Sequence, residues 1–400
     1  MAKRSKLSIG IAVFSSIIFL LVGACLGVAG KIFLFGDAGY YIPETEAAKQ
    51  SVAKGSMDVD VIKQQELSIH FIELGNKYTG DCTFIKVGDV EILIDAGSKA
   101  TSVQPIYEYV SQYVEGKLDY VIVTHAHQDH YAGFATGENT DSLFDLFDTN
   151  IVIQFAQSNQ KPTAKLFNNF KREIEQTKTE KGTKVYTSLE CYDNSNGAQR
   201  VYELGNNVTL EILKHKYYTE KAHTENDYSV CCMINQKIDA TNSRHYLFTG
   251  DLEEDGEESL VDTYLAENGK NLPEVVLYKA GHHGSKTSSS SKMLEVISPE
   301  IVCVCCCAGS SEYTSKNENQ FPTQAFIDRI APYTSQVYVT TLCLDYNKGS
   351  FESFNGNIVI SSNASENVKV ACANNDKLLK DTDWFAANRI MPDAWKKEIV

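Results

Sequence analysis

The sequence predicts a layered α/β domain that follows a membrane-spanning helix, and three observations support this. Short apolar runs alternate with helix-length segments between residues 67 and 340, a pattern typical of strands and helices that pack in layers. The 400 residues are 43% hydrophobic and 22% charged, which allows a substantial core and excludes wholesale disorder or a polytopic membrane protein. One uncharged run near the N-terminus stands outside this pattern.

That N-terminal run has the features of a signal anchor. Three basic residues within positions 1–6 precede an uncharged stretch of 24 residues from Leu7 to Gly30. As a helix this stretch would measure ~36 Å, enough to cross a bilayer. The basic flank predicts that the N-terminus stays in the cytoplasm. We therefore expect residues 1–36 to form a cytoplasmic tip and a transmembrane helix, and the protein to be a single-pass membrane protein whose body is extracytoplasmic.

Two other interpretations of the N-terminus stay open. Val22-Gly23-Ala24-Cys25 resembles a lipobox, which would place a lipid on Cys25. The same region could also be a signal peptide that is cleaved. The apolar character persists through residues 32–35, where a lipoprotein would turn polar, and this favours the uncleaved anchor.

The sequence that follows the expected anchor predicts a linker and then several strands. Residues 37–66 show no sustained helical or strand period, which predicts a linker. Strands are expected at 67–74, 82–87 and 91–95, because Gly80-Asp81 and Gly88-Asp89 mark turns between them. A helix at 102–115 and a short buried strand at 119–124 follow.

The alternation then continues to residue 363, so the domain is expected to span 67–363. Strands are predicted at 151–155, 208–213, 228–234, 245–249, 274–279, 301–307 and 336–340, and helices at 163–176, 253–267 and 323–330. A hairpin at 351–361 closes the domain. Polar residues 364–400 are expected to be a C-terminal tail with a short helix near Trp384.

Cysteine is concentrated in one predicted strand. Four of the 11 cysteines, Cys303, Cys305, Cys306 and Cys307, lie in a single apolar run. Neighbouring residues of a strand point to opposite faces. The run therefore predicts a strand that is buried on both sides, in which cysteine acts as a small hydrophobic residue.

The charge distribution limits the kinds of partner. The 37 basic and 52 acidic residues give a formal net charge of −15, which argues against a protein that grips nucleic acid with its whole surface. Lysines within 161–184 could steer a phosphate-rich polymer or simply form a solvated helix face. No stretch of sequence interleaves basic and aromatic residues, and no glycine loop for phosphate binding is found.

The strongest chemical motif follows the predicted strand 119–124. His125, His127, Asp129 and His130 lie within six residues of one another. Imidazole and carboxylate are the ligand types that zinc and similar divalent ions prefer. Four such side chains at the carboxyl end of a buried strand indicate a metal site.

Two later elements contribute side chains of the same kinds. Gly250-Asp251 follows the strand 245–249, and Gly281-His282-His283-Gly284-Ser285 follows the strand 274–279. Either alone would be typical of an ordinary turn or an exposed loop. Together with the first motif they indicate a site with two metal ions.

These motifs, with Asp95-Ala96-Gly97 before them, resemble the metallo-β-lactamase superfamily over residues 67–363. The resemblance implies a four-layer αββα sandwich that holds one or two metals at the edge of two facing sheets. The short sequence motifs at residues 225–229, 249–252 and 282–285 are similar to those of the extracellular hydrolase domain of ComEC-type competence proteins and of related surface phosphoesterases.

The resemblance implies roles for particular residues. His125 and His127 would bind the first metal, Asp129 and His130 the second, and Asp251 would bridge both. Asn226, or else His223, would be the third ligand of the first metal. His282 would complete the second site, while His283 would contact substrate or move a proton. Asp95 would orient a histidine ligand, and Ser285 and Lys286 would contact substrate.

One departure from the resemblance lies before the last helix. The competence-type domains commonly carry Asn-x-x-x-His-Pro, whereas this chain has Phe321 in the position of the histidine, between Asn317 and Pro322. A contact with substrate, or a proton donor, is therefore expected to be missing.

The predicted function is hydrolysis. Two divalent ions, Zn²⁺ or Mn²⁺, that share a bridging water generate hydroxide near neutral pH. A bridging aspartate matches the phosphodiesterase, thioesterase and nuclease branches of the superfamily. We expect an extracytoplasmic phosphodiesterase that acts on DNA or on a cell-surface phosphopolymer such as choline-decorated teichoic acid. A non-catalytic binding module, and hydrolysis of a β-lactam, thioester or phosphorylcholine ester, are the alternatives. No protein partner is identifiable.

Overall fold

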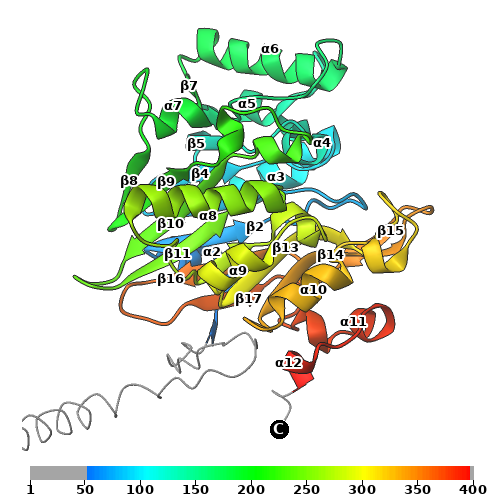
Figure 1. Ribbon diagram of the computed structural model, residues 1–400. Helices are drawn as coiled ribbons and strands as arrows, with labels where there is room; N and C mark the ends of the chain where they lie inside the picture. The colour runs from blue at the N-terminus through cyan, green and yellow to red at the C-terminus, as the bar shows by residue number, and fades with distance from the viewer. Residues whose placement is uncertain (1–51, 397–400) are drawn as a thin grey trace, which may run out of the picture. The chain divides into compact units, whose positions relative to one another are not determined.

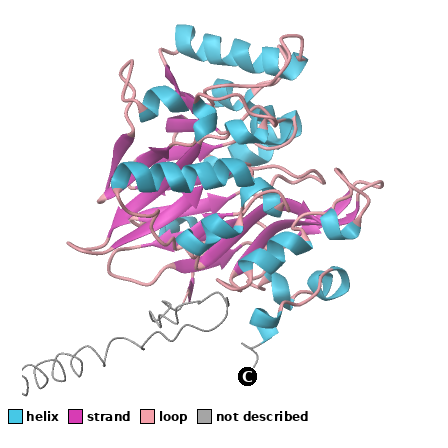
Figure 2. Cartoon of the chain, in the orientation of Figure 1, coloured by secondary structure: helices cyan, strands magenta, loops and turns pink. Residues whose placement is uncertain are grey.

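Two β-sheets form the centre of the computed structural model, which describes residues 52–396 (Figures 1 and 2). In order across the first sheet, its strands are β1 (Ala53–Lys54), β17 (Lys369–Cys372), β16 (Ile358–Ser362), β2 (Leu67–Phe71), β3 (Thr83–Val87), β4 (Val90–Ile94), β5 (Lys117–Val123), β6 (Asp148–Gln154) and β7 (Lys184–Thr187). Strands β4 to β7 pair in parallel. Their carboxyl ends therefore open on the same edge of the sheet.

The second sheet has a parallel half as well. Its strands, in order, are β15 (Ser350–Ser353), β14 (Val337–Asp345), β13 (Ile301–Ala308), β12 (Leu277–Lys279), β11 (Ser243–Phe248), β10 (Cys231–Lys237), β9 (Val208–Leu213) and β8 (Val201–Gly205). Strands β11 to β14 run in parallel. The loops that follow β11 and β12 therefore leave the sheet at one edge.

Helices cover the outer faces of both sheets (Figures 1 and 2). They are α2 (Val59–Lys63), α3 (Val103–Val110), α4 (Gln128–Tyr131), α5 (Leu143–Leu146), α6 (Lys165–Glu180), α7 (Ser188–Tyr192), α8 (Glu254–Asn268), α9 (Ser291–Ile297), α10 (Gln324–Ile330), α11 (Asp383–Asn388) and α12 (Asp393–Lys396). Apolar side chains of α8, α9 and α10 form one core with the outer face of the second sheet.

Adjacent residues of β2 show the layers. Phe71 faces the second sheet, where its ring centroid lies 6.5 Å from that of Phe248 in β11. His70 points the other way, and its ring contacts Tyr109 of α3 at 5.8 Å. A strand presents alternate residues to opposite faces, so these two contacts place α3 outside the first sheet and β11 inside. The predicted αββα sandwich is confirmed.

The cysteine-rich strand is buried on both sides, as predicted. Cys303 and Cys305 of β13 belong to the core between the sheets, whereas Val304 and Cys306 pack with α9 and α10. The ten cysteines in the described residues are free. Cysteine therefore serves here as a small hydrophobic residue.

The predicted domain boundaries are too narrow at both ends. Strand β17 lies in the segment expected to be a tail, yet it pairs with β16 inside the first sheet. Strand β1, from the expected linker, pairs with β17. Trp395 is buried and its Nε1 donates to the carbonyl of Thr334 at 2.9 Å. Such short strands carry little pattern of their own, and they are recognised only through the strands with which they pair.

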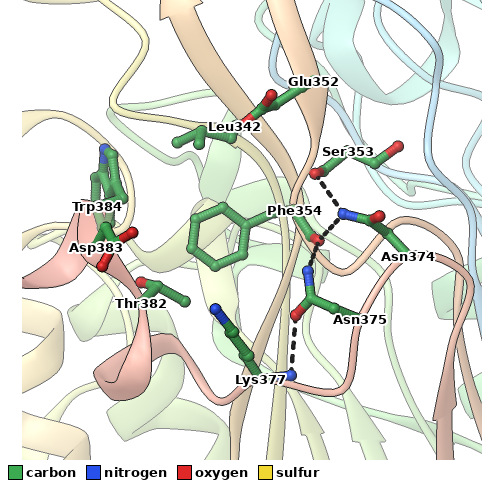
Figure 3. Close-up of a pocket in the computed structure, with 10 residues that line it drawn as sticks. All are labelled: Leu342, Glu352, Ser353, Phe354, Asn374, Asn375, Lys377, Thr382, Asp383 and Trp384. Atoms are coloured by element: carbon green, nitrogen blue, oxygen red, sulfur yellow. Dashed lines mark hydrogen bonds between the residues drawn. The ribbon is translucent and has the colours of Figure 1, made fainter.

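The C-terminal segment also forms one wall of a pocket of about 340 Å³ (Figure 3). Trp384 and Phe354 line it, and their rings meet edge to face at 6.3 Å. Asn374 donates to the carbonyls of Ser353 and Phe354. These contacts attach the segment firmly to the second sheet.

The predicted membrane anchor, residues 1–36, lies outside the described residues. Within positions 52–396, no helix combines the length and the apolar character needed to span a bilayer.

A buried glutamate connects α8 to the loop that follows β12. The carboxylate of Glu257 accepts hydrogen bonds from the backbone N–H groups of Ser289 at 2.7 Å and Ser290 at 2.6 Å. Burial raises the pKa of Glu257 to about 7, although these bonds and Arg329 of α10 oppose the change. The loop 285–290, which follows the paired histidines, is thus fixed from the helix layer.

The raised pKa of Glu257 predicts a pH-dependent stability. Between about pH 4.5 and pH 7 the folded carboxyl keeps its proton while the unfolded one loses it. Stability must therefore fall as pH rises across this window, by at most ~3 kcal/mol. Urea unfolding at pH 5 and pH 7.5 should show that Glu257→Gln removes part of this fall. An equal pH dependence in wild type and variant would contradict the prediction.

Candidate metal centre

The first group of metal-capable side chains follows β5. His125 is buried directly after the strand, and its Nε2 lies 3.1 Å from Nδ1 of His127. On its other side, Nδ1 of His125 lies 3.2 Å from Oγ1 of Thr124. Two imidazole nitrogens that face each other across so short a distance need a shared proton or a shared cation.

The second group has His130 at its centre. Nδ1 of His130 donates to Oδ2 of Asp95 at 2.7 Å, and Thr124 donates to the same carboxylate through its N–H and its hydroxyl. Nε2 of His130 is thereby directed at Oδ2 of Asp251, 3.1 Å away. A carboxylate that orients a metal-binding histidine makes this contact.

The second sheet supplies Asp251 and His283. Asp251 follows β11 through Gly250, which has φ of +54°, and an added Cβ there would lie 2.8 Å from Oγ of Ser229. His283 follows β12, and its Nδ1 donates to the carbonyl of Cys305 at 2.8 Å. Its Nε2 lies 3.3 Å from Oδ2 of both Asp129 and Asp251.

These residues fit a divalent cation. Ligand atoms of Asp81, His130, Asp251 and His283 all lie within 4.8 Å of one another, and all four residues are buried. Oδ1 of Asp251 is also buried and has no hydrogen-bond partner among the described residues. Leaving such an oxygen uncompensated costs ~1–3 kcal/mol or more, and a coordinated metal ion removes that cost.

The structure assigns the paired histidines differently from the sequence. His282 was expected to complete the second site, with His283 contacting substrate. His283 instead points its Nε2 into the carboxylate cluster, whereas Nε2 of His282 is 3.9 Å from Asp251 and its Nδ1 lies near Glu253 and Thr287. The geometry favours His283 as the ligand because its Nε2 is closer to the carboxylates than that of His282.

Other predicted residues are placed as follows. Asn226 lies next to the cluster, where its Nδ2 donates to Glu253 at 3.0 Å and its buried Oδ1 has no partner among the described residues. His223 is exposed and is not part of the cluster. Ser285 contacts Thr287, and Lys286 is exposed. Neither residue lines the pocket beside the cluster.

That pocket has a volume of about 420 Å³. It is lined by Ser98, Lys99, His127, Gln128, Asp129, His282, Glu312 and Tyr313. Three metal-capable side chains, His127, Asp129 and His282, therefore line the pocket, together with residues from loops that follow strands of both sheets.

Sequence reasoning missed Asp81 and Lys279. Asp81, in the loop before β3, forms a buried ion pair with Lys279 at the end of β12. Nζ of Lys279 also donates to the carbonyl of Gly250 at 3.3 Å and lies 3.7 Å from Asp251. A lone lysine in an apolar strand was the available signal, because buried lysine almost always has a partner.

Opposing effects set the protonation of these groups when no metal is bound. Burial alone would lower the pKa of Lys279, but Asp81 and Asp251 outweigh it and raise the pKa. Burial alone would also lower the pKa of His130. Three nearby carboxylates outweigh burial and raise this pKa to about 10. Negative charge dominates the centre.

Residues 75–137 match the model of the metallo-beta-lactamase superfamily. This segment contains Asp81, Asp95 and the motif from His125 to His130. The match therefore covers the part of the chain that carries the first group of metal-capable side chains.

A curated relative points to one branch of the metallo-β-lactamases. The competence protein ComA of Neisseria gonorrhoeae is 42% identical over 96 residues. The match covers 24% of this chain and only 12% of the relative. The resemblance to competence proteins is thus shown, but it spans a small part of that protein's length.

Solved structures of similar arrangement have low sequence identity. The metallo-beta-lactamase fold protein YhfI of Bacillus subtilis is 12% identical, covering 68% of this chain and 95% of its own, with a TM-score of 0.37. Long-form RNase Z from yeast is 13% identical, covering 75% and 42%, also at 0.37. A diphosphatase of the PhnP family is 12% identical, covering 59% and 85%, at 0.33.

Residues 75–137 thus resemble the metallo-β-lactamase superfamily, and the buried cluster of carboxylates and imidazoles has the chemistry of a metal site.

The buried ion pair between Asp81 and Lys279 predicts how the stability of the protein responds to loss of Lys279. Lys279→Met removes the buried lysine cation that pairs with Asp81 and lies near Asp251, so the metal-free protein should lose ~3 kcal/mol or more of stability. Added zinc should restore most of the loss, since the metal supplies positive charge at the same carboxylates. Thermal melts with chelator and with zinc would measure both effects.

Lys348→Met is the matched control, because Lys348 forms an exposed pair with Asp345. It should change little under either condition. A Lys279→Met protein that is as stable as wild type without metal would contradict the prediction.

Proposed function

We propose that the chain is a membrane-anchored, extracytoplasmic phosphodiesterase that uses two divalent metal ions. One observation carries the proposal: Asp251 lies where the two groups of imidazole ligands meet. Its Oδ2 is 3.1 Å from Nε2 of His130, whose ring centroid lies 4.2 Å from that of His125 in the other group. A carboxylate shared in this way is what a two-metal site requires.

The donor atoms divide into two sets. Nε2 of His125 and Nδ1 of His127 would hold the first ion, with Oδ1 of Asn226 as a further donor. Asp129, His130 and His283 would hold the second, and Asp251 would bridge. Mixed imidazole and carboxylate ligands suit Zn²⁺ and Mn²⁺.

Ions bound at such a site supply hydroxide near neutral pH and neutralise charge that develops on a phosphoryl group. The protein's own residues keep the site in shape. Asp95 fixes His130, the carbonyl of Cys305 fixes His283, and Lys279 neutralises Asp81. Ligands held in this way need little rearrangement when substrate binds.

Basic and aromatic side chains beside the pocket support a nucleic-acid substrate. Nζ of Lys99, which lines the pocket, lies 4.2 Å from the ring centroid of Tyr78. Nζ of Lys77 lies 5.4 Å from the same ring and 4.3 Å from that of Tyr346. We call Lys77, Tyr78, Lys99 and Tyr346 the rim strip.

The rim strip suits single-stranded nucleic acid better than a choline-bearing polymer. Alternating ammonium groups and rings can bind phosphates and stack bases. Choline also binds aromatic rings, but here lysines already lie over those rings and would repel a quaternary ammonium group. DNA is therefore the substrate we propose.

Asp251→Asn tests the hydrolase directly. The soluble body of wild type should contain two zinc or manganese ions and should cleave bis-p-nitrophenyl phosphate and a single-stranded DNA oligonucleotide. The variant should lose at least ~100-fold in kcat/KM, because it removes the shared carboxylate. Elemental analysis and initial rates would measure these changes.

Asp262→Asn is the control, because Asp262 of α8 forms an exposed pair with Lys292 of α9. It should keep full activity. Wild-type protein with no stoichiometric metal and no turnover would contradict the proposal and support a binding module, while turnover of p-nitrophenylphosphorylcholine alone would indicate a choline esterase.

The membrane location rests on the sequence of residues 1–36 and on the partial resemblance to a competence protein. The full chain, expressed in bacteria, should stay in the membrane pellet after carbonate extraction. Protease added to spheroplasts should digest its body. Deleting residues 1–36 should release the protein, and a full chain that is extracted by carbonate would contradict the anchor.

A further inference from the structure

The loop between β13 and α10 carries an unassigned side chain to the mouth of the metal pocket. Tyr313 lines that pocket together with His127 and Asp129. The side chain is 57% exposed, so the core does not need it. Its hydroxyl nevertheless donates to Oδ2 of Asp129 at 2.8 Å.

Phe321 holds the ring of Tyr313 over the site. The two ring centroids are 5.6 Å apart, and the Phe321 ring lies 5.7 Å from those of both His282 and His283. Phenylalanine can neither donate nor accept a strong hydrogen bond. Of the two aromatic side chains from this loop, Tyr313 is therefore the one that can donate a hydrogen bond to a ligand in the pocket.

The hydroxyl also has the right chemistry for an anionic ligand. A phenolic hydroxyl donates hydrogen bonds, and the oxygens of a phosphoryl group accept them. A phosphoryl group that reaches Asp129 must come within the range of this hydroxyl, because the two already lie in hydrogen-bond contact.

We propose that Tyr313 is a substrate-contacting catalytic residue, whose hydroxyl donates a hydrogen bond to an oxygen of the phosphoryl group. The hydroxyl transfers its hydrogen bond from Asp129 to the substrate, and no covalent bond forms or breaks in this contact. The inference rests on the proposed phosphodiester chemistry and adds a residue that the metal-binding motifs do not contain.

Tyr313→Phe removes only the hydroxyl and keeps the packing on Phe321. In zinc-loaded protein, the variant should keep its metal content and melting temperature. It should lose ~10- to 100-fold in kcat/KM for bis-p-nitrophenyl phosphate. Inorganic phosphate, measured by isothermal titration calorimetry, should bind at least ~5-fold more weakly, because a hydrogen bond to a charged group is lost.

Tyr107→Phe is the matched control. Tyr107 lies in α3, where its ring packs on Phe147 at 5.2 Å, outside the pocket lining. This variant should match wild type in metal content, phosphate affinity and turnover.

The outcomes separate this inference from the proposed function. Weaker phosphate binding by Tyr313→Phe than by wild type supports the inference, whether or not wild type cleaves a phosphodiester. Failure of wild type to cleave a phosphodiester would overturn only the proposed function. Equal phosphate affinity in wild type and Tyr313→Phe, or no phosphate binding by wild type, overturns the inference. Loss of metal from Tyr313→Phe also overturns it, because the hydroxyl would then position Asp129 instead.

Discussion

Negative charge gathered between the two sheets is the constraint on which the rest of the site depends. Asp81, Asp95 and Asp251 are all buried, and buried carboxylates are costly unless cations or hydrogen bonds compensate them. Lys279 compensates Asp81, and His130 compensates Asp95. Oδ1 of Asp251 has no hydrogen-bond partner among the described residues, and the nearest cation, Nζ of Lys279, is 3.7 Å away. A cation site is the arrangement that makes this much buried charge tolerable.

The parts of the molecule that are local in sequence could be predicted. Strand and helix alternation is visible in a short window, and the ligands from His125 to His130 follow a single strand. Parallel strands then place Asp251 and His283 together, because β11 and β12 are neighbours. The four-layer fold, the cysteine-rich strand and the place of the metal centre follow from such patterns and from the family resemblance.

Contacts between distant segments could not be predicted. Asp81 looked like part of a turn, and only the structure brings it to Lys279. The rim strip joins residues near position 77 to Tyr346, although no stretch of sequence interleaves basic and aromatic residues. Strand β17 lies in the segment that its polar composition predicted to be a tail, yet it pairs with β16. In each case the partner, and not the local pattern, determines the structure.

The paired histidines show why a motif alone does not assign roles. His282 and His283 have φ of +46° and +54°, a backbone region that costs non-glycine residues ~1–3 kcal/mol each. Ordinary loop geometry would avoid this cost. Here the conformation directs Nε2 of His283 into the carboxylate cluster, where the carbonyl of Cys305 fixes the other ring nitrogen, and leaves His282 on the pocket wall. Such strain persists when surrounding structure enforces it and when the site gains from it. The strained pair is therefore independent support for a functional centre at this edge of the sandwich.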